Sequence, residues 1–418
     1  MEQPKTIAII GGGITGLAAA FRAERLFPDA EIELFEASDS VGGVLQTEHF
    51  DPFVIEQSAD MFVTDPPFAW DLVEQLGKTD ELIQTKPTRD RAFVATANSM
   101  HPVPRGLSLM LPNDVDSILA SPLLDDAAKA RFLEERNVPP RESNEDESLE
   151  SFAVRRFGKS VFQQLIQPLV SGIYTADPKK LSMNATMSRF VKMERDYGSL
   201  IVAAEKSKSS TNEKEASGAR YGLFRAPKNG MGQLVQWITE SFTRTQIRTS
   251  STVGSLSKSD SKWCFNVEQN GELTAHQSDA IVIATPARVA GEIIEDIDSQ
   301  LAQKISSIQT ASSAIVVLGV DQAQLSDDSK PDSSFEGYGI IVPAVLGRKV
   351  IATSLSSNKF AGRAPDGKYL IRTFIGGALQ SELVELSDDE LIKIATNELQ
   401  LTVGFKGSPE MALSLIHI

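Results

Sequence analysis

The chain has 418 residues, of which 41% are hydrophobic and 23% charged, a composition that excludes a mainly disordered or fibrous protein. Its net charge of −15 disfavours non-specific binding to nucleic acid or anionic lipid. The single cysteine, Cys264, excludes an intrachain disulfide and a multi-cysteine metal site, and no apolar run reaches the ~20 residues of a membrane-spanning helix.

The first predicted elements form a βαβ unit. Residues 6–10, TIAII, are a β-branched apolar run that predicts a buried strand and leaves no room before it for a secretory signal. The apolar residues between Ile14 and Phe21 follow the spacing of an amphipathic helix. Residues 31–36, EIELFE, predict a second strand, parallel to the first.

Later elements are spread along the chain without an internal repeat. Residues 70–135 are expected to be mainly helical fragments separated by prolines, and 149–166 continue as amphipathic helix. Strands are predicted at 247–253, 263–268, 280–284, 312–320, 349–354 and 369–375, and the continuous apolar run AIVIA at 280–284 is expected to be buried. This order predicts a nucleotide-binding domain whose two halves are separated by a helical insertion.

A dinucleotide-binding pattern, Gly11-x-Gly13-x-x-Gly16, connects the first strand to the first helix. The first glycine permits a tight turn, the second lets the backbone approach a pyrophosphate, and the third lets helix and strand pack closely. Glu36 follows Gly16 at the distance expected of an acid that binds the ribose. The alternative is a glycine-rich turn beside an exposed glutamate, which this combined context disfavours.

A second glycine pair, Gly42-Gly43, lies shortly after Glu36. Close backbone approach there suits the far side of the pyrophosphate in an extended FAD better than in NAD, with a plain turn as the alternative. Residues 57–60 are candidates to run near the flavin.

No catalytic side chain is predicted. The four histidines, His49, His101, His276 and His417, do not stand at zinc-site spacing with another ligand, so no metal site is expected. The chemistry would therefore come from the cofactor.

These motifs resemble those of one family, the flavin-dependent protoporphyrinogen oxidases and coproporphyrinogen III oxidases. The resemblance runs from Lys5 to about Leu379, and its two glycine segments occur in many flavoproteins. The more specific segments are QPLVSGIYTADPKKL at 167–181, PKNGMGQL at 227–234 and SSNKFAGRAP at 356–365.

The resemblance implies an α/β fold of three parts. A discontinuous Rossmann-like FAD-binding domain would occupy 1–84 and 222–285, a helical insertion 86–204, and a mixed-sheet substrate-binding domain 286–408. The insertion would rest on a membrane surface, and its apolar segment GLSLMLP at 106–112 is the candidate contact. The alternative for this segment is an ordinary part of the core.

The resemblance implies oxidation of a porphyrinogen to a porphyrin in haem biosynthesis, with six electrons leaving in three pairs. FAD would accept each pair, and dioxygen would reoxidise it to hydrogen peroxide. The sequence leaves open whether the substrate is protoporphyrinogen or coproporphyrinogen, which differ in two vinyl groups against two propionates. It also leaves open a cytoplasmic or a peripheral membrane location, and a monomer or a homodimer.

We predict the site residues from the glycine turn, from Glu36 and from the family resemblance. Val253 would pair with the adenine through its backbone, and Phe360 and Ile341 would line the porphyrinogen ring, which Gly172 would let the backbone approach. The expected cofactor-binding residues are Gly11, Gly12, Gly13, Ile14, Thr15, Gly16, Glu36, Ala37, Gly42, Gly43, Val44, Gln57, Ser58, Ala59, Asp60 and Val253.

Arginine suits a propionate because its planar guanidinium binds carboxylate through two hydrogen bonds. Arg89 and Arg91 lie in the region from which family members reach a propionate, and Arg91, two residues before Phe93, is preferred. The alternative is a solvated turn, in which case Arg105 or Lys359 would take the role.

The chain departs from the family pattern at two places. Ser58-Ala59 stands where the family usually has Gly-Pro. Family members also continue beyond the GGA at 376–378 into a segment that closes over the FAD, whereas this chain ends in LSLIHI at 413–418. We therefore expect a longer natural protein and weak FAD binding by these residues alone.

Two other functions remain open. One is a different oxidase or desaturase of the same fold, such as an amine oxidase or a phytoene desaturase. The other is a non-catalytic binder, as in the Rab GDP-dissociation inhibitors, because fold alone does not imply activity.

Overall fold

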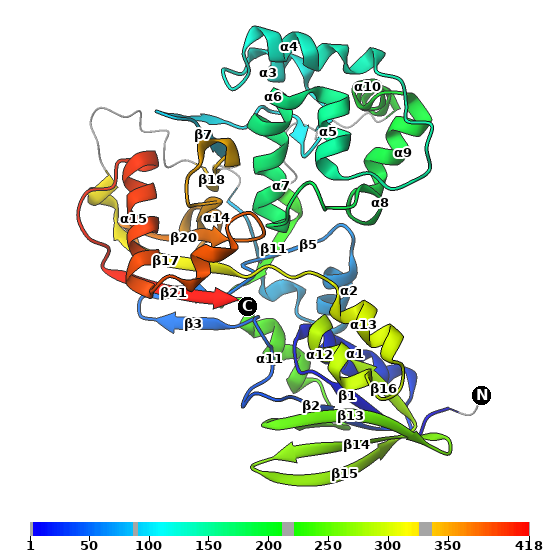
Figure 1. Cartoon of the computed structure of the whole chain (residues 1–418). Coiled ribbons are helices and arrows are strands. Elements are labelled where there is room, and N and C mark those ends of the chain that lie inside the picture. The colour runs from blue at the N-terminus through cyan, green and yellow to red at the C-terminus, as the bar shows by residue number, and fades with distance from the viewer. Residues whose placement is uncertain (1–2, 87–90, 211–220, 326–336, 418) are drawn as a thin grey trace. The chain divides into compact units, whose positions relative to one another are not determined.

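A computed structural model describes residues 3–86, 91–210, 221–325 and 337–417 (Figure 1). The chain divides into two compact units, the first comprising Met1–Ile83 with Arg225–Thr310 and the second Gln84–Phe224 with Ala311–Ile418. Helices α12 (Ala287–Ile294) and α13 (Ser299–Ser306) belong to the first unit, where Ile293 is buried in the core. The boundary expected at residue 286 therefore lies near 310.

A four-stranded parallel sheet forms the centre of the first unit. Its order is β12 (Thr245–Arg248), β2 (Glu31–Phe35), β1 (Thr6–Ile10), β16 (Ala280–Ile283), and α1 (Ile14–Leu26) connects β1 to β2. The predicted βαβ unit is confirmed. The expectation that 280–284 is a buried strand is wrong, because β16 is the last strand of the sheet and Val282 is 36% exposed.

An antiparallel sheet of β13 (Ser251–Ser259), β14 (Lys262–Gln269) and β15 (Glu272–Ser278) packs its apolar residues against Phe35 and Ile293. The strand predicted at 247–253 is divided into β12 and β13, because Ser250 takes a left-handed conformation with φ 51°. The remaining elements are β3 (Thr47–Phe50), β4 (Phe53–Glu56), β5 (Phe62–Val63), α2 (Phe68–Gln75), η1 (Thr79–Glu81), β6 (Leu82–Gln84), β11 (Phe224–Pro227) and α11 (Gly232–Glu240).

Glu24 on α1 holds the loop that leads into β12. Its carboxylate accepts hydrogen bonds from the N–H groups of Arg244 at 2.9 Å and Thr245 at 2.7 Å, and from the Thr245 hydroxyl at 2.8 Å. Burial by itself would raise the pKa of Glu24, but these bonds and the N–H of Thr243 lower it to about 2.

Because the folded-state pKa of Glu24 lies below its ordinary value of 4.5, its stabilisation is present above pH 4.5 and disappears as the pH falls through 2. Glu24→Gln should therefore cost about 2 kcal/mol at pH 7, and less at pH 3. Urea unfolding of both proteins at the two pH values measures this. Glu31→Gln, at an exposed position, serves as the control. If Glu24→Gln lost the same unfolding free energy at pH 7 and pH 3, the lowered pKa of Glu24 would be contradicted.

A seven-stranded mixed sheet forms one part of the second unit. Its order is β21 (Met411–His417), β17 (Ser313–Asp321), β20 (Lys368–Gly376), β19 (Ala352–Leu355), β18 (Gly339–Ile341), β7 (Ala92–Ala95), β8 (Met100–Pro102). Only β18 and β7 run parallel among these described pairs. Leu391, Ala395 and Leu399 of α15 (Asp388–Val403) are buried in its core. The strands β7 and β8 lie where mainly helical fragments were expected.

Short helices around a second apolar core form the other part of this unit (Figure 1). They are α3 (Val115–Ala120), α4 (Asp126–Leu133), η3 (Glu134–Asn137), α5 (Leu149–Phe157), α6 (Lys159–Val161), the π-helical turn η4 (Phe162–Ile166), α7 (Gln167–Tyr174), α8 (Met183–Thr186), α9 (Ser188–Tyr197) and α10 (Leu200–Ser210). The unit also contains β9 (Leu107–Ser108), β10 (Leu111–Pro112), η5 (Tyr221–Leu223), η6 (Gln322–Leu325), η8 (Ala344–Leu346), α14 (Ser356–Lys359) and η9 (Ser381–Glu385).

The segment 106–112 lies inside this helical core. Leu107 is 7% exposed and Met110 is fully buried, and both pack among the helices. The membrane contact expected through this segment is therefore wrong, and the alternative, an ordinary core segment, is confirmed. Among the described residues, no helix combines the length and apolarity needed to cross a bilayer.

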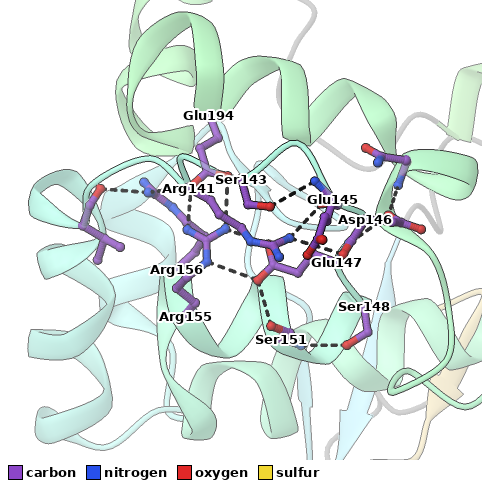
Figure 2. A network of polar contacts seen from close by, with 12 residues as sticks. Arg141, Ser143, Glu145, Asp146, Glu147, Ser148, Ser151, Arg155, Arg156 and Glu194 are labelled. Atoms are coloured by element: carbon purple, nitrogen blue, oxygen red, sulfur yellow. Dashed lines mark hydrogen bonds and ion pairs between the residues drawn. The ribbon is translucent and has the colours of Figure 1, made fainter.

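A network of buried charges holds the helices together. Figure 2 shows Arg155 and Arg156 of α5 converging on Glu194 of α9, with Arg155 also bonded to Glu147. Burial by itself would raise the pKa of Glu147, but bonds from Arg155 and Ser151 hold it below its usual range. These pairs connect α5 and α9 with the loop before α5.

Candidate functional site

Two glycines of the turn between β1 and α1, Gly11 and Gly16, leave no room for a side chain. Gly11 has φ +105°, and a Cβ there would lie 2.6 Å from the carbonyl oxygen of Ala284. A Cβ on Gly16 would lie 1.9 Å from the carbonyl oxygen of Gly11. These two glycines therefore allow the helix to start directly against the strand.

Gly13 differs from its neighbours, because a Cβ on it would meet no heavy atom within 4 Å. Its backbone is extended, with φ −65° and ψ 174°, so the residue itself does not require glycine conformation. It is the N-cap of the 13-residue helix α1, and it offers no capping side chain. No acidic residue stands in the first turn. An open cradle before an uncapped helix N-terminus fits a phosphate group.

The second glycine pair lies directly against this turn. The N–H of Gly42 donates to the carbonyl of Gly12 at 2.8 Å, and Gly42 forms a parallel bridge with Gly13. A Cβ on Gly43 would lie 3.3 Å from the Cα of Gly13. The structure thus brings together two segments that the sequence separates, and Val44, which follows, is 62% exposed beside them.

Glu36 ends β2 with its carboxylate at the same turn. It accepts hydrogen bonds from the N–H of Gly12 at 2.6 Å, and from the N–H and hydroxyl of Ser38 at 2.8 Å and 2.6 Å. A carboxylate has about four acceptor positions, so Glu36 is held in place and can still accept a bond from a ribose hydroxyl.

Residues 57–60 run beside the segment that follows Gly43. The N–H of Gln57 donates to Gln46 at 2.9 Å, and the hydroxyl of Ser58 donates to the carbonyl of Val44 at 2.5 Å. Ala59 is exposed and Asp60 is buried. Serine at 58 therefore bonds to the same segment that carries the second glycine pair.

Val253 is the third residue of β13, not the end of a strand as predicted. Its side chain is buried in the core, so only its backbone is available to a ligand. Two residues before it, the N–H of Ser251 donates to the carbonyl of Glu36 at 2.8 Å, which places the start of β13 beside the acid.

Of the residues predicted to bind substrate, the structure brings together Gly172 on α7 and Ile341 on β18. A Cβ on the exposed Gly172 would lie 3.5 Å from Cγ2 of Ile341. Phe360, in contrast, is 1% exposed, with the Arg363 guanidinium 5.7 Å from its ring centre. This burial leaves the Phe360 ring no surface for a ligand, so we do not propose it as a substrate contact.

Arg91 is exposed just before β7, where its carbonyl accepts a 2.6 Å hydrogen bond from the N–H of Tyr338. Within the described residues its guanidinium has no carboxylate partner. Arg89 lies outside the described residues. No group of His, Cys, Asp and Glu that could hold a metal ion occurs among those described.

A cavity of about 290 Å³ in the second unit was missed by the sequence analysis. It lies against the side of α7 that carries Gln167 and Ser171, and Thr175, which directly follows the helix, also lines it. Its lining residues are Gln167, Ser171, Thr175, Ala176, Val342, Ala344, Arg348, Val350, Ile351, Gly376, Leu379 and Gln380. The sequence did contain a signal for this cavity. Gln167, Ser171 and Thr175 are polar residues spaced four positions apart in an otherwise apolar segment.

Comparison with known proteins extends over both units. A family model described as flavin containing amine oxidoreductase matches residues 14–414. The coproporphyrinogen III oxidase of Bacillus subtilis (strain 168) is 29% identical over 98% of this chain and 85% of the relative. Protoporphyrinogen oxidase 1, chloroplastic, of Arabidopsis thaliana is 28% identical over 94% of this chain and 73% of the relative.

One solved structure is similar in both fold and sequence. The putative protoporphyrinogen oxidase from Exiguobacterium sp. 255-15 is 26% identical with a TM-score of 0.85, and the match covers 100% of this chain and 87% of that chain.

Proposed function

Because the chain belongs to the flavin containing amine oxidoreductase family, we propose that its flavin is FAD and that it oxidises a porphyrinogen to the porphyrin in haem biosynthesis, with dioxygen as the acceptor. The observation that carries this proposal is the similarity to coproporphyrinogen III oxidase and protoporphyrinogen oxidases over 94–98% of the chain. The geometry of the first unit supports the proposal that it binds FAD. The second unit supplies the candidate substrate contacts.

The pyrophosphate of FAD would occupy the cradle at Gly13, where the α1 N–H groups and helix dipole favour negative charge. Gly42 and Gly43 would border it from the other side. Glu36 would accept a bond from the adenosine ribose, and the backbone of Val253 would meet the adenine. Residues 57–60 would continue toward the flavin ring.

When bound, the flavin would supply the acceptor for two electrons and two protons from the substrate, and dioxygen would take both to become hydrogen peroxide. The chain's own contribution is to position the cofactor through rigid backbone contacts. Gly172 and Ile341 would hold the tetrapyrrole ring, because an exposed glycine beside an apolar side chain offers a flat surface. No residue is proposed as a general base.

The function is tested by aerobic turnover with each porphyrinogen. Removing six electrons in pairs requires three dioxygen molecules per porphyrin, so three hydrogen peroxide molecules should appear for each porphyrin formed. Porphyrin fluorescence and a peroxidase-coupled assay measure the two products. Flavin-containing protein that produced neither would contradict the proposal, and oxidation of a primary amine instead would favour the amine oxidase alternative.

Arg91→Ala should raise KM and leave kcat nearly unchanged, if Arg91 binds a propionate equally in the ground and transition states. A charge-assisted contact of ~1.5–3 kcal/mol corresponds to roughly a ten- to hundredfold change in KM. Steady-state kinetics on both porphyrinogens measure this, with Arg91→Lys as a partial rescue. If KM and kcat are unchanged, Arg91 does not bind the propionate, and Arg105 or Lys359 becomes the candidate.

A further inference from the structure

The segment PKNGMGQL at 227–234 forms the turn that begins helix α11 in the first unit. Within it, Gly230 has φ +104°, and a Cβ there would lie 2.5 Å from Oγ1 of Thr47, the first residue of β3. A Cβ on Gly232 would lie 3.2 Å from the backbone nitrogen of Thr47. The two glycines therefore let this turn lie directly against the β3–β4 hairpin.

Side chains of the hairpin cap the start of α11. The N–H of Met231 donates to the two carboxylate oxygens of Glu56 at 3.0 Å and 3.1 Å, and the N–H of Gly232 donates to the Thr47 hydroxyl at 2.8 Å. Thr47 in turn donates to Glu56, its cross-strand neighbour, at 2.7 Å. Because α11 has no capping side chain of its own and no acidic residue in its first turn, the hairpin supplies both.

The Glu56 carboxylate is buried, with the residue only 2% exposed. Hydrogen bonds from Met231 and Thr47, and its place at a helix N-terminus, stabilise it there. The start of α1 differs, because its N-cap Gly13 offers no side chain and no acidic residue follows in the first turn. The protein thus closes the N-terminus of α11 itself.

The capping pair is joined to the residues predicted to run near the flavin. Glu56 directly precedes 57–60 in the chain. The N–H of Gln57 donates to the carbonyl of Gln46 at 2.9 Å, and Gln46 directly precedes Thr47. The position of 57–60 is therefore set by a hairpin that is itself fixed to α11.

Helix α11 also packs against the second glycine pair. A Cβ on Gly42 would lie 3.2 Å from both methyl carbons of Val235, which is 8% exposed. The side-chain amide of Gln46 donates to the carbonyl of Val41 at 3.1 Å, which fixes the turn from the hairpin side. One predicted cofactor segment thus contacts α11 directly, and the other is held to it through Glu56.

We propose that Thr47 and Glu56 are positioning residues for FAD, which act by anchoring both of these segments to α11. The inference rests on the proposed cofactor, and neither side chain is assigned a contact with it. Without the Thr47 hydroxyl, the N–H of Gly232 would lose its acceptor and the buried Glu56 would lose a donor. FAD binding should then weaken although every residue predicted to contact FAD is unchanged.

Three threonine variants test the proposal. Thr47→Val keeps the shape of the side chain and removes the hydroxyl, whereas Thr47→Ser keeps the hydroxyl. Thr245→Val is the matched control, because the Thr245 hydroxyl donates to Glu24 at 2.8 Å in the same unit. Thr245 pairs with Ile32, near the end of β2 that lies away from Glu36. The readouts are the Kd for FAD from flavin fluorescence, the visible circular dichroism of bound flavin, and urea unfolding of the apoprotein.

We expect Thr47→Val to raise the Kd for FAD about tenfold or more and to alter the visible circular dichroism of the bound flavin. Thr47→Ser should bind as wild type does. Thr245→Val should lower the urea midpoint about as much as Thr47→Val and leave the Kd unchanged. Wild-type affinity in Thr47→Val, or an equal rise in Kd in Thr245→Val, would overturn the proposal.

A further variant addresses the same anchoring without removing a hydrogen bond. Val235→Ala loosens the packing of α11 on Gly42 and should raise the Kd for FAD several-fold. If Thr47→Val does not fold, an unchanged Kd in Val235→Ala overturns the proposal in its place.

The same titration separates this inference from the proposed function. Wild-type protein that binds FAD but oxidises neither porphyrinogen would refute the proposed function, and the comparison of Kd values would still decide the roles of Thr47 and Glu56. Wild-type protein that binds no FAD would contradict both the proposed cofactor and this inference.

Discussion

Replacing Gly13 by valine should greatly weaken flavin binding and lower turnover while the first unit stays folded. A Cβ at this position meets no heavy atom within 4 Å, and the residue's φ of −65° is one that valine adopts without strain. The added side chain would instead occupy the space proposed for the pyrophosphate. Overpacking of about 1–3 kcal/mol, together with lost contacts to the α1 N–H groups, should weaken FAD binding by on the order of a hundredfold.

Gly16→Val provides the contrast for this variant. Its Cβ would lie 1.9 Å from the carbonyl oxygen of Gly11, so it should lose both flavin and fold. Bound flavin absorbance and circular dichroism, measured on both variants, separate the two effects. A Gly13→Val protein that purifies with full flavin occupancy would rule out the assigned phosphate position. Loss of its secondary structure would show that the open space at Gly13 serves folding.

Arg156→Ala should cause the largest loss of stability in the second unit. Arg156 is fully buried, and its guanidinium bonds to Glu135 and Glu194 and to the carbonyl of Val138 at 2.8 Å. Glu135 in turn accepts from the N–H of Leu200 at 2.9 Å, at the start of α10. Alanine would leave the buried Glu135 carboxylate without its arginine partner and Glu194 with Arg155 alone, at a cost of about 3–5 kcal/mol.

A neighbouring arginine gives the matched control. Arg136 pairs with Glu205, but both side chains are exposed, at 37% and 49%. Arg136→Ala should therefore cost no more than about 1 kcal/mol. Urea denaturation of the two variants and the wild type measures the difference. Equal losses for Arg136→Ala and Arg156→Ala would refute the role assigned to the buried network (Figure 2).

Local patterns were sufficient where a residue's role depends on its immediate neighbours. The strand, glycine turn and helix at Thr6–Leu26 could be predicted because their apolar spacing is local and because a Cβ on Gly16 would meet the nearby Gly11. The sequence assigned Gly42-Gly43 to the far side of the pyrophosphate, and the hydrogen bond between Gly42 and Gly12 was found only in the structure. The contact positions proposed for FAD remain predictions.

Where the sequence predictions were wrong, contacts between residues distant in sequence determine the burial and the strand pairing. GLSLMLP at 106–112 is apolar enough for a membrane surface, but the helices around it bury Leu107 and Met110. The run at 280–284 is as apolar as a central strand, but β16 pairs with one neighbour only among the described strands. The cavity beside α7 joins residues about 200 positions apart in the chain, and no local pattern reports such a meeting.

Anaerobic mixing of the FAD-loaded protein with a porphyrinogen tests the central claim most directly. If the chain is a flavin-dependent porphyrinogen oxidase, the yellow flavin absorbance should bleach within the turnover time as the substrate is oxidised. Admitting dioxygen should restore the absorbance, release hydrogen peroxide and complete the formation of fluorescent porphyrin. Flavin that stays oxidised in the presence of both protoporphyrinogen and coproporphyrinogen would contradict the account.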